Sequence, residues 1–226
     1  MTDLHTHILP KMDDGSSSIE ESLALLEQEC QQGVDSVFLT SHFYRQQETI
    51  MEFCHRREKA FDLLRSVTPE NAPALYLGAE VAWYPSLARE PLNLLTLGNS
   101  SYFLLELPFE PWSGRILDQL YQLTCITGLT PILAHVERYR SIQSEHQMAE
   151  LLAMGLPMQL NADSLLSWKS RGSCKKLMRT GRWHLSSDCH NLKRRPPRMG
   201  KAIRFLSAEE AEQLTAWTPG KEENSP

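Results

Sequence analysis

Short apolar runs alternate with amphipathic segments along most of the chain, a pattern typical of β-strands that are each followed by a helix. The apolar runs that predict strands are 36–40, 75–77, 102–107, 131–134, 158–160 and 183–186. Segments with helical spacing, such as 115–127 and 145–154, lie between them. The pattern predicts an α/β fold with a parallel sheet in one domain, residues 1–218, followed by a polar tail at 219–226.

The first helix is predicted to begin near Ser18 and to end at Gly33. Ser17 and Ser18 are each followed by a glutamate three residues later, as in a capping box. The apolar positions that share one face, and are expected to pack on the sheet, are Ile19, Leu23, Leu26 and Cys30.

Composition and charge exclude several classes of protein. The 226 residues carry a net charge of -5 with both signs interspersed, which argues against a general nucleic-acid or membrane surface. No basic region followed by an apolar run begins the chain, and no stretch has the length of a membrane span, so a soluble cytoplasmic protein is expected. The five cysteines are scattered without C-x-x-C pairs, which predicts reduced thiols, mostly in packing roles.

Side chains that can bind metals occur at or just after the predicted strands. They are His5, His7, His42, Glu80, Glu106, His135, Asp188 and His190. In barrels and open α/β sheets, the loops after the strands form one working face, so we expect these side chains to converge. His5 with His7 and Asp188 with His190 have the spacing that points two side chains of an extended chain the same way.

Each feature alone also has a structural explanation. H-x-H sequences are common, His135 by itself fits a hydrogen-bonded core histidine, and Asp13-Asp14-Gly15 fits a turn. Glu106 is harder to explain in this way, because it lies in an apolar run where an unpaired carboxylate costs several kcal/mol. A buried Glu80 would have the same cost, but the sequence Trp83-Tyr84-Pro85 after it could place Glu80 at a solvated turn.

Imidazole and carboxylate ligands without thiolates suit manganese, iron, zinc or magnesium. One ion cannot use so many ligands, so the set predicts two or three metals, and such clusters activate water for hydrolysis of phosphate esters. Arg138 and Arg195 lie three and five residues after His135 and His190, where forked cations could bind phosphoryl oxygens.

The motifs together resemble the PHP (polymerase and histidinol phosphatase) family, and within it the bacterial tyrosine-protein phosphatases of capsule and exopolysaccharide clusters. The segments that carry the resemblance are DLHTHILP at 3–10, DDG at 13–15, SH at 41–42, GAEV at 78–81, LELP at 105–108, AHVERY at 134–139 and SDCHN at 187–191. They extend in order over most of the chain, to about Met199. The chain departs from the usual family motifs at Thr40-Ser41-His42-Phe43 and at Val136, without losing a ligand.

The resemblance implies a distorted (β/α)7 TIM-like barrel with three metal ions, most often manganese. One ion is expected at His5, His7, Glu80 and Asp188, a second at Asp14, His42 and His190, and a third at Glu80, Glu106 and His135. Arg138 and Arg195 are expected to hold the phosphate. The implied substrate is phosphotyrosine on the tail of a bacterial tyrosine kinase that controls polysaccharide export. An oligomer is compatible with this role, but no residue argues for one.

Three alternatives stay open at this point. A small-molecule phosphomonoesterase, of the histidinol-phosphate or nucleotide type, would use the same metals. A regulatory protein could keep the ions without catalysis, although retention of every expected ligand and of both arginines weighs against this. A metal-dependent amidohydrolase would need a bridging lysine that is missing from the strand ends. Cys189 is not expected to be a nucleophile, because its surroundings lack the glycines of a phosphate-binding loop.

Overall fold

The computed structural model of the protein describes residues 1–216, and its strands form two parallel sheets. The first sheet has the order β1-β2-β4 and the second the order β3-β5-β6-β7-β8-β9. The strands are β1 (Thr2–Thr6), β2 (Ser36–Leu39), β3 (His42–Phe43), β4 (Ala74–Leu77), β5 (Glu80–Ala82), β6 (Tyr102–Glu106), β7 (Thr130–Leu133), β8 (Met158–Asn161) and β9 (Trp183–Ser186). All six predicted strands are therefore present, with small changes at their ends.

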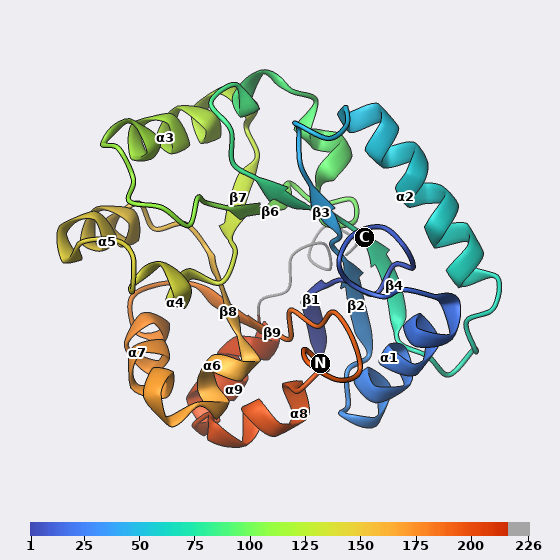
Figure 1. Ribbon diagram of the computed structural model, residues 1–226. Helices are drawn as coiled ribbons and strands as arrows, with labels where there is room; N and C mark the ends of the chain where they lie inside the picture. Colours follow the sequence, from blue (N-terminus) through green and yellow to red (C-terminus); the bar gives the residue numbers. More distant parts are fainter. Residues whose placement is uncertain (217–226) are drawn as a thin grey trace.

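The two sheets form one ring because two of its strands are kinked. A break at Thr40-Ser41 separates β2 from β3, and a break at Gly78-Ala79 separates β4 from β5. At the other edge, the ring closes where Asp188 N–H donates to the His5 carbonyl at 2.9 Å, just beyond β9. Figure 1 shows the strands around the centre of the molecule. Within residues 1–216, the expected distorted seven-stranded barrel is confirmed when β2/β3 and β4/β5 each count once.

The kink at Gly78 leaves little room for a Cβ. A Cβ placed there would lie 2.7 Å from Leu97 Cδ2 and 3.0 Å from Thr40 Cγ2. The second broken strand thus packs directly against Thr40, at the break in the first. This close approach lets β3 and β5 turn toward the rim that carries His42 and Glu80.

Helices surround the ring of strands (Figure 1). The α-helices are α1 (Ile19–Gln31), α2 (Ile50–Arg65), α3 (Arg115–Thr127), α4 (Val136–Tyr139), α5 (Glu145–Ala153), α6 (Ala162–Leu166), α7 (Trp168–Met178), α8 (Met199–Ala202) and α9 (Ala208–Ala216). Short 3-10 helices occupy Leu87–Arg89, Leu92–Leu95 and Ile203–Phe205. The helices predicted at 115–127 and 145–154 are confirmed, whereas α2, which starts with a complete Thr49–Glu52 capping box, was not predicted.

The buried face of α1 agrees with the expected one in part, because Leu26 is buried and Ile19 and Leu23 pack, partly buried, against the core. Ser18 caps the helix as predicted, but the buried residues are Ser22, Leu25, Leu26 and Glu29, and Cys30 is exposed. The buried face follows from a polar contact, because Ser22 Oγ donates to the Ile8 carbonyl at 2.6 Å and turns the helix toward the loop after β1. Apolar spacing alone could not predict that contact.

Apolar side chains fill one end of the ring and leave the other end polar. A small cluster of Leu4, Phe38, Leu97, Leu104, Ile132 and Ala134 joins residues from strands on different sides of the ring, so these side chains meet in its interior. A larger cluster lies between the strands and the helices. Polar side chains near the carboxyl ends of the strands can therefore face one another.

Among residues 1–216, no helix has both the length and the apolar character needed to cross a membrane. The polar tail expected at 219–226 lies outside the described residues.

Candidate metal centre

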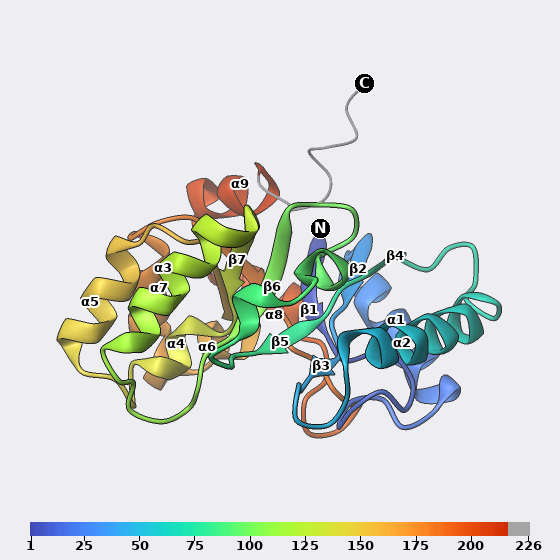
Figure 2. The same ribbon diagram turned by 90° about the horizontal axis from the view of Figure 1, so that it is seen from above.

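The structure brings all nine predicted metal ligands together at the carboxyl ends of the strands. They are His5, His7, Asp14, His42, Glu80, Glu106, His135, Asp188 and His190, and each lies within 3.7 Å of another member of the set. Figure 2 shows β3 and the loop after β9 on one side of the molecule, with α9 on the opposite side. The expected convergence is a property of the fold.

His5, His7 and Glu80 form a buried group with the spacing that a metal ion requires, and Asp188 lies beside its two imidazoles. The Nε2 atoms of His5 and His7 lie 3.1 Å apart. His5 Nε2 lies 3.1 Å from a Glu80 oxygen, and His7 Nε2 lies 3.5 Å from Asp188 Oδ1. Two ligands that each bind a metal at about 2.1 Å, on adjacent corners of its coordination sphere, lie about 3 Å apart. The donors and distances therefore fit the first expected ion.

A second group surrounds Asp14. Its Oδ1 lies 3.6 Å from His42 Nε2 and 3.4 Å from His190 Nε2. His7 also reaches this group, so its imidazole lies between the first and the second cluster. The side chain of Asp14 is 69% exposed, which makes it the most accessible of these ligands.

The third group contains Glu80, Glu106 and His135. His135 Nε2 lies 2.9 Å from Glu80 and 3.2 Å from Glu106, and His42 approaches the same two carboxylates. The burial of the two glutamates is the reverse of the expected order: the Glu80 side chain is 1% exposed and that of Glu106 is 16% exposed. Glu80 is covered because its carboxylate contacts the imidazoles of His5, His42 and His135.

The carboxylates of the cluster favour positive charge beside them, which protons supply when no metal ion is bound. Burial alone lowers the pKa of His7, but Asp13 and Glu80 raise it to about 10, and Glu106 and Glu80 raise that of His135 to about 9 despite burial. Burial raises the pKa of Glu80 and Asp188, yet the charge of His5 lowers both well below the usual range. Burial and the charges of His7 and Arg195 lower the pKa of His190 to about 3. Cations and carboxylates thus balance within the cluster, and metal ions would compete with protons.

Asp13 holds two ligands and was missed as a functional residue, because its sequence context fits a turn. Its carboxylate accepts hydrogen bonds from His7 Nδ1 and from the His42 backbone N–H, both at 2.8 Å, and from the Gly15 N–H at 2.9 Å. A proton held on Nδ1 leaves His7 Nε2 free to bind a metal. Sequence alone could not decide which of Asp13 and Asp14 faces inward.

Two amides at the end of β8 were also missed. Gln159 Oε1 lies 3.0 Å from His5 Nδ1 and accepts the backbone N–H of His135 at 2.7 Å. Asn161 Nδ2 donates to Asp188 Oδ2 at 2.8 Å. Their spacing of two residues at a strand end is the same signal that identified His5 with His7, and it could have found them.

The backbone is strained at two proposed ligands. His135 has φ 33° and Asp188 has φ 53°, values in the left-handed region that few residues other than glycine adopt. The His135 backbone is held by Gln159, and Asp188 by its N–H bond to His5. Strain retained in this way is typical of functional sites.

The two predicted arginines converge on Asp188. Its Oδ2 atom lies 2.8 Å from Arg138 Nη2 and 2.5 Å from Arg195 Nη2, while its Oδ1 atom faces His5 and His7. Arg195 Nη1 also lies 2.8 Å from His190 Nε2. The arginine side chains are 39% and 36% exposed, so a ligand from solvent can reach them beside the ligand cluster.

Cys189 points away from the cluster, as expected. Its thiol is buried 3.7 Å from Glu29, and burial together with the charges of Glu29 and Asp3 raises its pKa well above the usual range. A thiol that stays protonated is a poor nucleophile. The structure therefore gives no support to a cysteine-based reaction.

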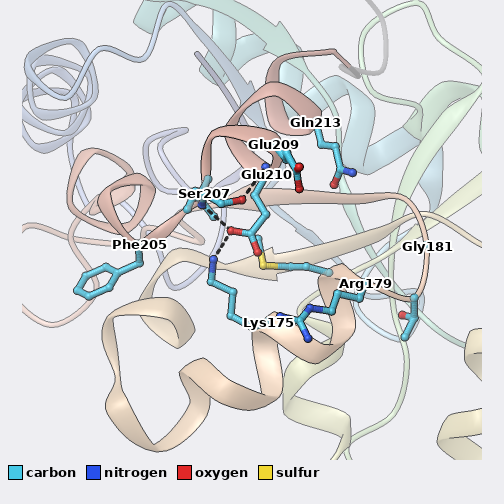
Figure 3. Close-up of a pocket in the computed structure, with 11 residues that line it drawn as sticks. Lys175, Arg179, Gly181, Phe205, Ser207, Glu209, Glu210 and Gln213 are labelled. Atoms are coloured by element: carbon cyan, nitrogen blue, oxygen red, sulfur yellow. Dashed lines mark hydrogen bonds and ion pairs between the residues drawn. The ribbon is translucent and has the colours of Figure 1, made fainter.

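The large hollow in Figure 3 is not part of this centre. It has a volume of about 1040 Å³ and lies between the end of α7 and the start of α9, where Lys175 pairs with Glu210. The α7 end precedes β9, so the hollow lies at the amino ends of the strands. The ligands lie at the carboxyl ends.

Comparison with known proteins identifies the relatives of this chain. Residues 1–217 match the family described as capsular polysaccharide synthesis, CpsB/CapC. The chain belongs to the CpsB/CapC family. It is 33% identical over 245 residues to the tyrosine-protein phosphatase CpsB of Streptococcus pneumoniae, covering 98% of this chain and 97% of that protein. It is 28% identical over 226 residues to the tyrosine-protein phosphatase YwqE of Bacillus subtilis, covering 95% of this chain and 87% of that protein.

A solved structure shares the CpsB/CapC fold. It comes from work on YwqE of Bacillus subtilis and CpsB of Streptococcus pneumoniae, described as unique metal-dependent tyrosine phosphatases. The match has a TM-score of 0.79 at 23% sequence identity and covers 96% of this chain and 92% of that one. The likeness supports the barrel architecture independently of the ligand geometry.

Proposed function

We propose that this CpsB/CapC protein is a metal-dependent phosphatase that hydrolyses phosphotyrosine in proteins. The observation that carries the proposal is the position of Asp188, which faces two imidazoles with one oxygen and two arginines with the other. Hydrolysis of a phosphate monoester requires bidentate cationic groups that bind its oxygens and a group that activates water. The relatives named tyrosine-protein phosphatases support the same assignment.

The nine side chains of the cluster would hold two or three divalent ions, with manganese as the proposed ion. Iron, zinc and magnesium share part of this donor preference. When bound, the ions would supply Lewis-acid stabilisation of phosphoryl oxygens and lower the pKa of water. Glu80 contacts His5, His42 and His135, and is therefore the carboxylate best placed to bridge ions.

The residues of the chain have distinct tasks in this reaction. Arg138 and Arg195 bind the phosphate by exchanging their bonds to Asp188 for bonds to phosphoryl oxygens. Asp13 keeps the Nε2 atom of His7 free for a metal. The phenol of tyrosine has a pKa of about 10, so tyrosinate is a better leaving group than an alkoxide and needs less assistance.

The proposed substrate is phosphotyrosine on the tail of a bacterial tyrosine kinase that controls capsule or exopolysaccharide synthesis. The family description supports a place in capsule synthesis. We place the reaction in the cytoplasm. The free state of all five cysteines, of which Cys30 and Cys125 are exposed, supports a reducing compartment.

The test is phosphate release from a phosphotyrosine peptide by metal-stripped protein, with and without added manganese. We expect manganese-dependent release that is lost in a Glu106→Ala and His135→Ala double variant, because the third group is removed. The matched control is Glu150→Ala with His146→Ala, an exposed pair at 3.6 Å on α5, which should retain full activity.

Two further results complete the test. Arg138→Lys and Arg195→Lys should each lower kcat/KM by about 100-fold or more, because a single ammonium cannot replace a forked donor. Absence of phosphate release from the folded protein with manganese, iron, zinc or magnesium would refute the proposed function. Faster turnover of histidinol phosphate or nucleotides than of the peptide would favour the small-molecule alternative.

A further inference from the structure

An exposed aromatic ring lies against one of the proposed ligands. Phe109, in the loop after β6, is 45% exposed. Its ring stacks on the imidazole of His135, with centroids 5.3 Å apart and planes at 29°, and it also contacts Tyr139 at 5.4 Å. Tyr139 directly follows Arg138, so Phe109 lies beside the segment that carries a phosphate-binding arginine.

The loop around Phe109 is fixed in this position. On one side, the Leu107 N–H donates to Tyr139 Oη at 2.8 Å. On the other side, Gln143 Nε2 donates to the Glu110 carbonyl at 2.8 Å. Burial of a phenyl ring is favourable, and a free loop would turn it inward. These bonds hold the ring half-exposed at the rim, where it can meet another apolar group.

A second aromatic ring stacks on another proposed ligand, His42, which contacts the carboxylate of Glu80 as His135 does. Tyr44 follows β3 and stacks on His42, with centroids 5.1 Å apart and planes at 27°. His42 and His135 contact different oxygens of Glu80, at 3.0 and 2.9 Å, so the two aromatic rings stack on the two imidazoles that share this carboxylate.

We propose that Phe109 and Tyr44 bind the phenol ring of the substrate and thereby select aryl phosphates over alkyl phosphates. The inference rests on the proposed function and names the part of the site that recognises the leaving group. Aromatic rings attract one another in offset or edge-to-face arrangements, so the rings of Phe109 and Tyr44 favour a flat ring over a short alkyl group. Neither residue belongs to the groups of side chains that could hold a metal ion.

The experiment compares the binding of two non-hydrolysable phosphonates to the manganese-loaded protein by calorimetric titration. Benzylphosphonate carries an aromatic ring, and methylphosphonate does not. The variants are Phe109→Leu and Tyr44→Leu. The matched control is Phe205→Leu, because Phe205 is 41% exposed but lies over Arg171 in the wall of the hollow in Figure 3. Manganese affinity and unfolding temperature are measured for each variant.

We expect the native protein to bind benzylphosphonate more tightly than methylphosphonate. Phe109→Leu and Tyr44→Leu should each weaken the binding of benzylphosphonate about 3- to 10-fold and leave the affinities for methylphosphonate and manganese unchanged. An equal loss for both phosphonates, or no loss for either, would overturn the aromatic site while leaving the proposed function intact. If the native protein binds neither phosphonate and releases no phosphate from the peptide, both conclusions fail.

Discussion

Replacement of Asp13 by asparagine tests whether a residue outside the ligand set controls metal binding. The carboxylate accepts three hydrogen bonds, from His7 Nδ1, the His42 N–H and the Gly15 N–H, and its side chain is 6% exposed. An asparagine has one acceptor oxygen. If that oxygen faces His7, the amide NH2 group faces the Gly15 N–H, and two donors meet.

The expected magnitude follows from these contacts. Loss of the negative charge turns a charge-assisted bond to His7 into a weaker neutral one, and the imidazole is no longer held firmly in the metal-binding tautomer. Partners of this kind typically contribute 10- to 100-fold to metal affinity. We therefore expect Asp13→Asn to weaken manganese binding by about 10- to 100-fold, which corresponds to about 1.4 to 2.7 kcal/mol.

The assay is calorimetric titration of metal-stripped protein with manganese, accompanied by circular dichroism to confirm folding. Asp163→Asn is the matched control, because Asp163 is 48% exposed and pairs with Arg198 at 3.4 Å. Its manganese affinity should stay within about twofold of the native value. A folded Asp13→Asn protein with native manganese affinity would refute the role assigned to Asp13.

Three other predictions concern protons, the loop after β1 and the buried thiol. The fold raises the pKa of His7 to about 10 and that of His135 to about 9, from 6.5, so the stability from these protons is present below pH 6.5 and lost as pH rises through 9 to 10. The metal-free protein should therefore unfold at a lower temperature at about pH 10 than at about pH 8. Manganese binding near pH 7.5 should release protons, which calorimetry in buffers of different ionisation enthalpy measures. Manganese binding without proton release would contradict this prediction. Gly15→Ala should abolish manganese binding in the same titration, because a Cβ would lie 2.2 Å from the His7 carbonyl oxygen and 2.5 Å from His7 Cβ; native affinity would show that the loop can shift. Cys189→Ser should retain most peptide phosphatase activity, since the thiol faces Glu29, and a loss as large as that of the Glu106 and His135 double variant would argue for a thiol mechanism.

The sequence by itself determined six of the nine strands of residues 1–216, the helices α1, α3 and α5, and eight of the nine clustered side chains, whereas Asp14 came from the family resemblance. These features depend on local chemistry. Apolar spacing favours a strand or a helix wherever it occurs, and imidazole and carboxylate groups bind the same class of ion in any fold. Their convergence was also predictable, because parallel strands joined by helices place their carboxyl ends on one face.

Only the tertiary structure decided which neighbours each side chain meets. Asp13 faces His7 while Asp14 reaches solvent, because the loop after β1 folds back against the ring. The carboxylate of Glu80 contacts the imidazoles of His5, His42 and His135, so it is more buried than that of Glu106. Phe109 and Tyr44 come from segments 65 residues apart and stack on two imidazoles that contact one carboxylate, that of Glu80. Burial and contact depend on packing between distant segments, and local sequence patterns do not contain that information.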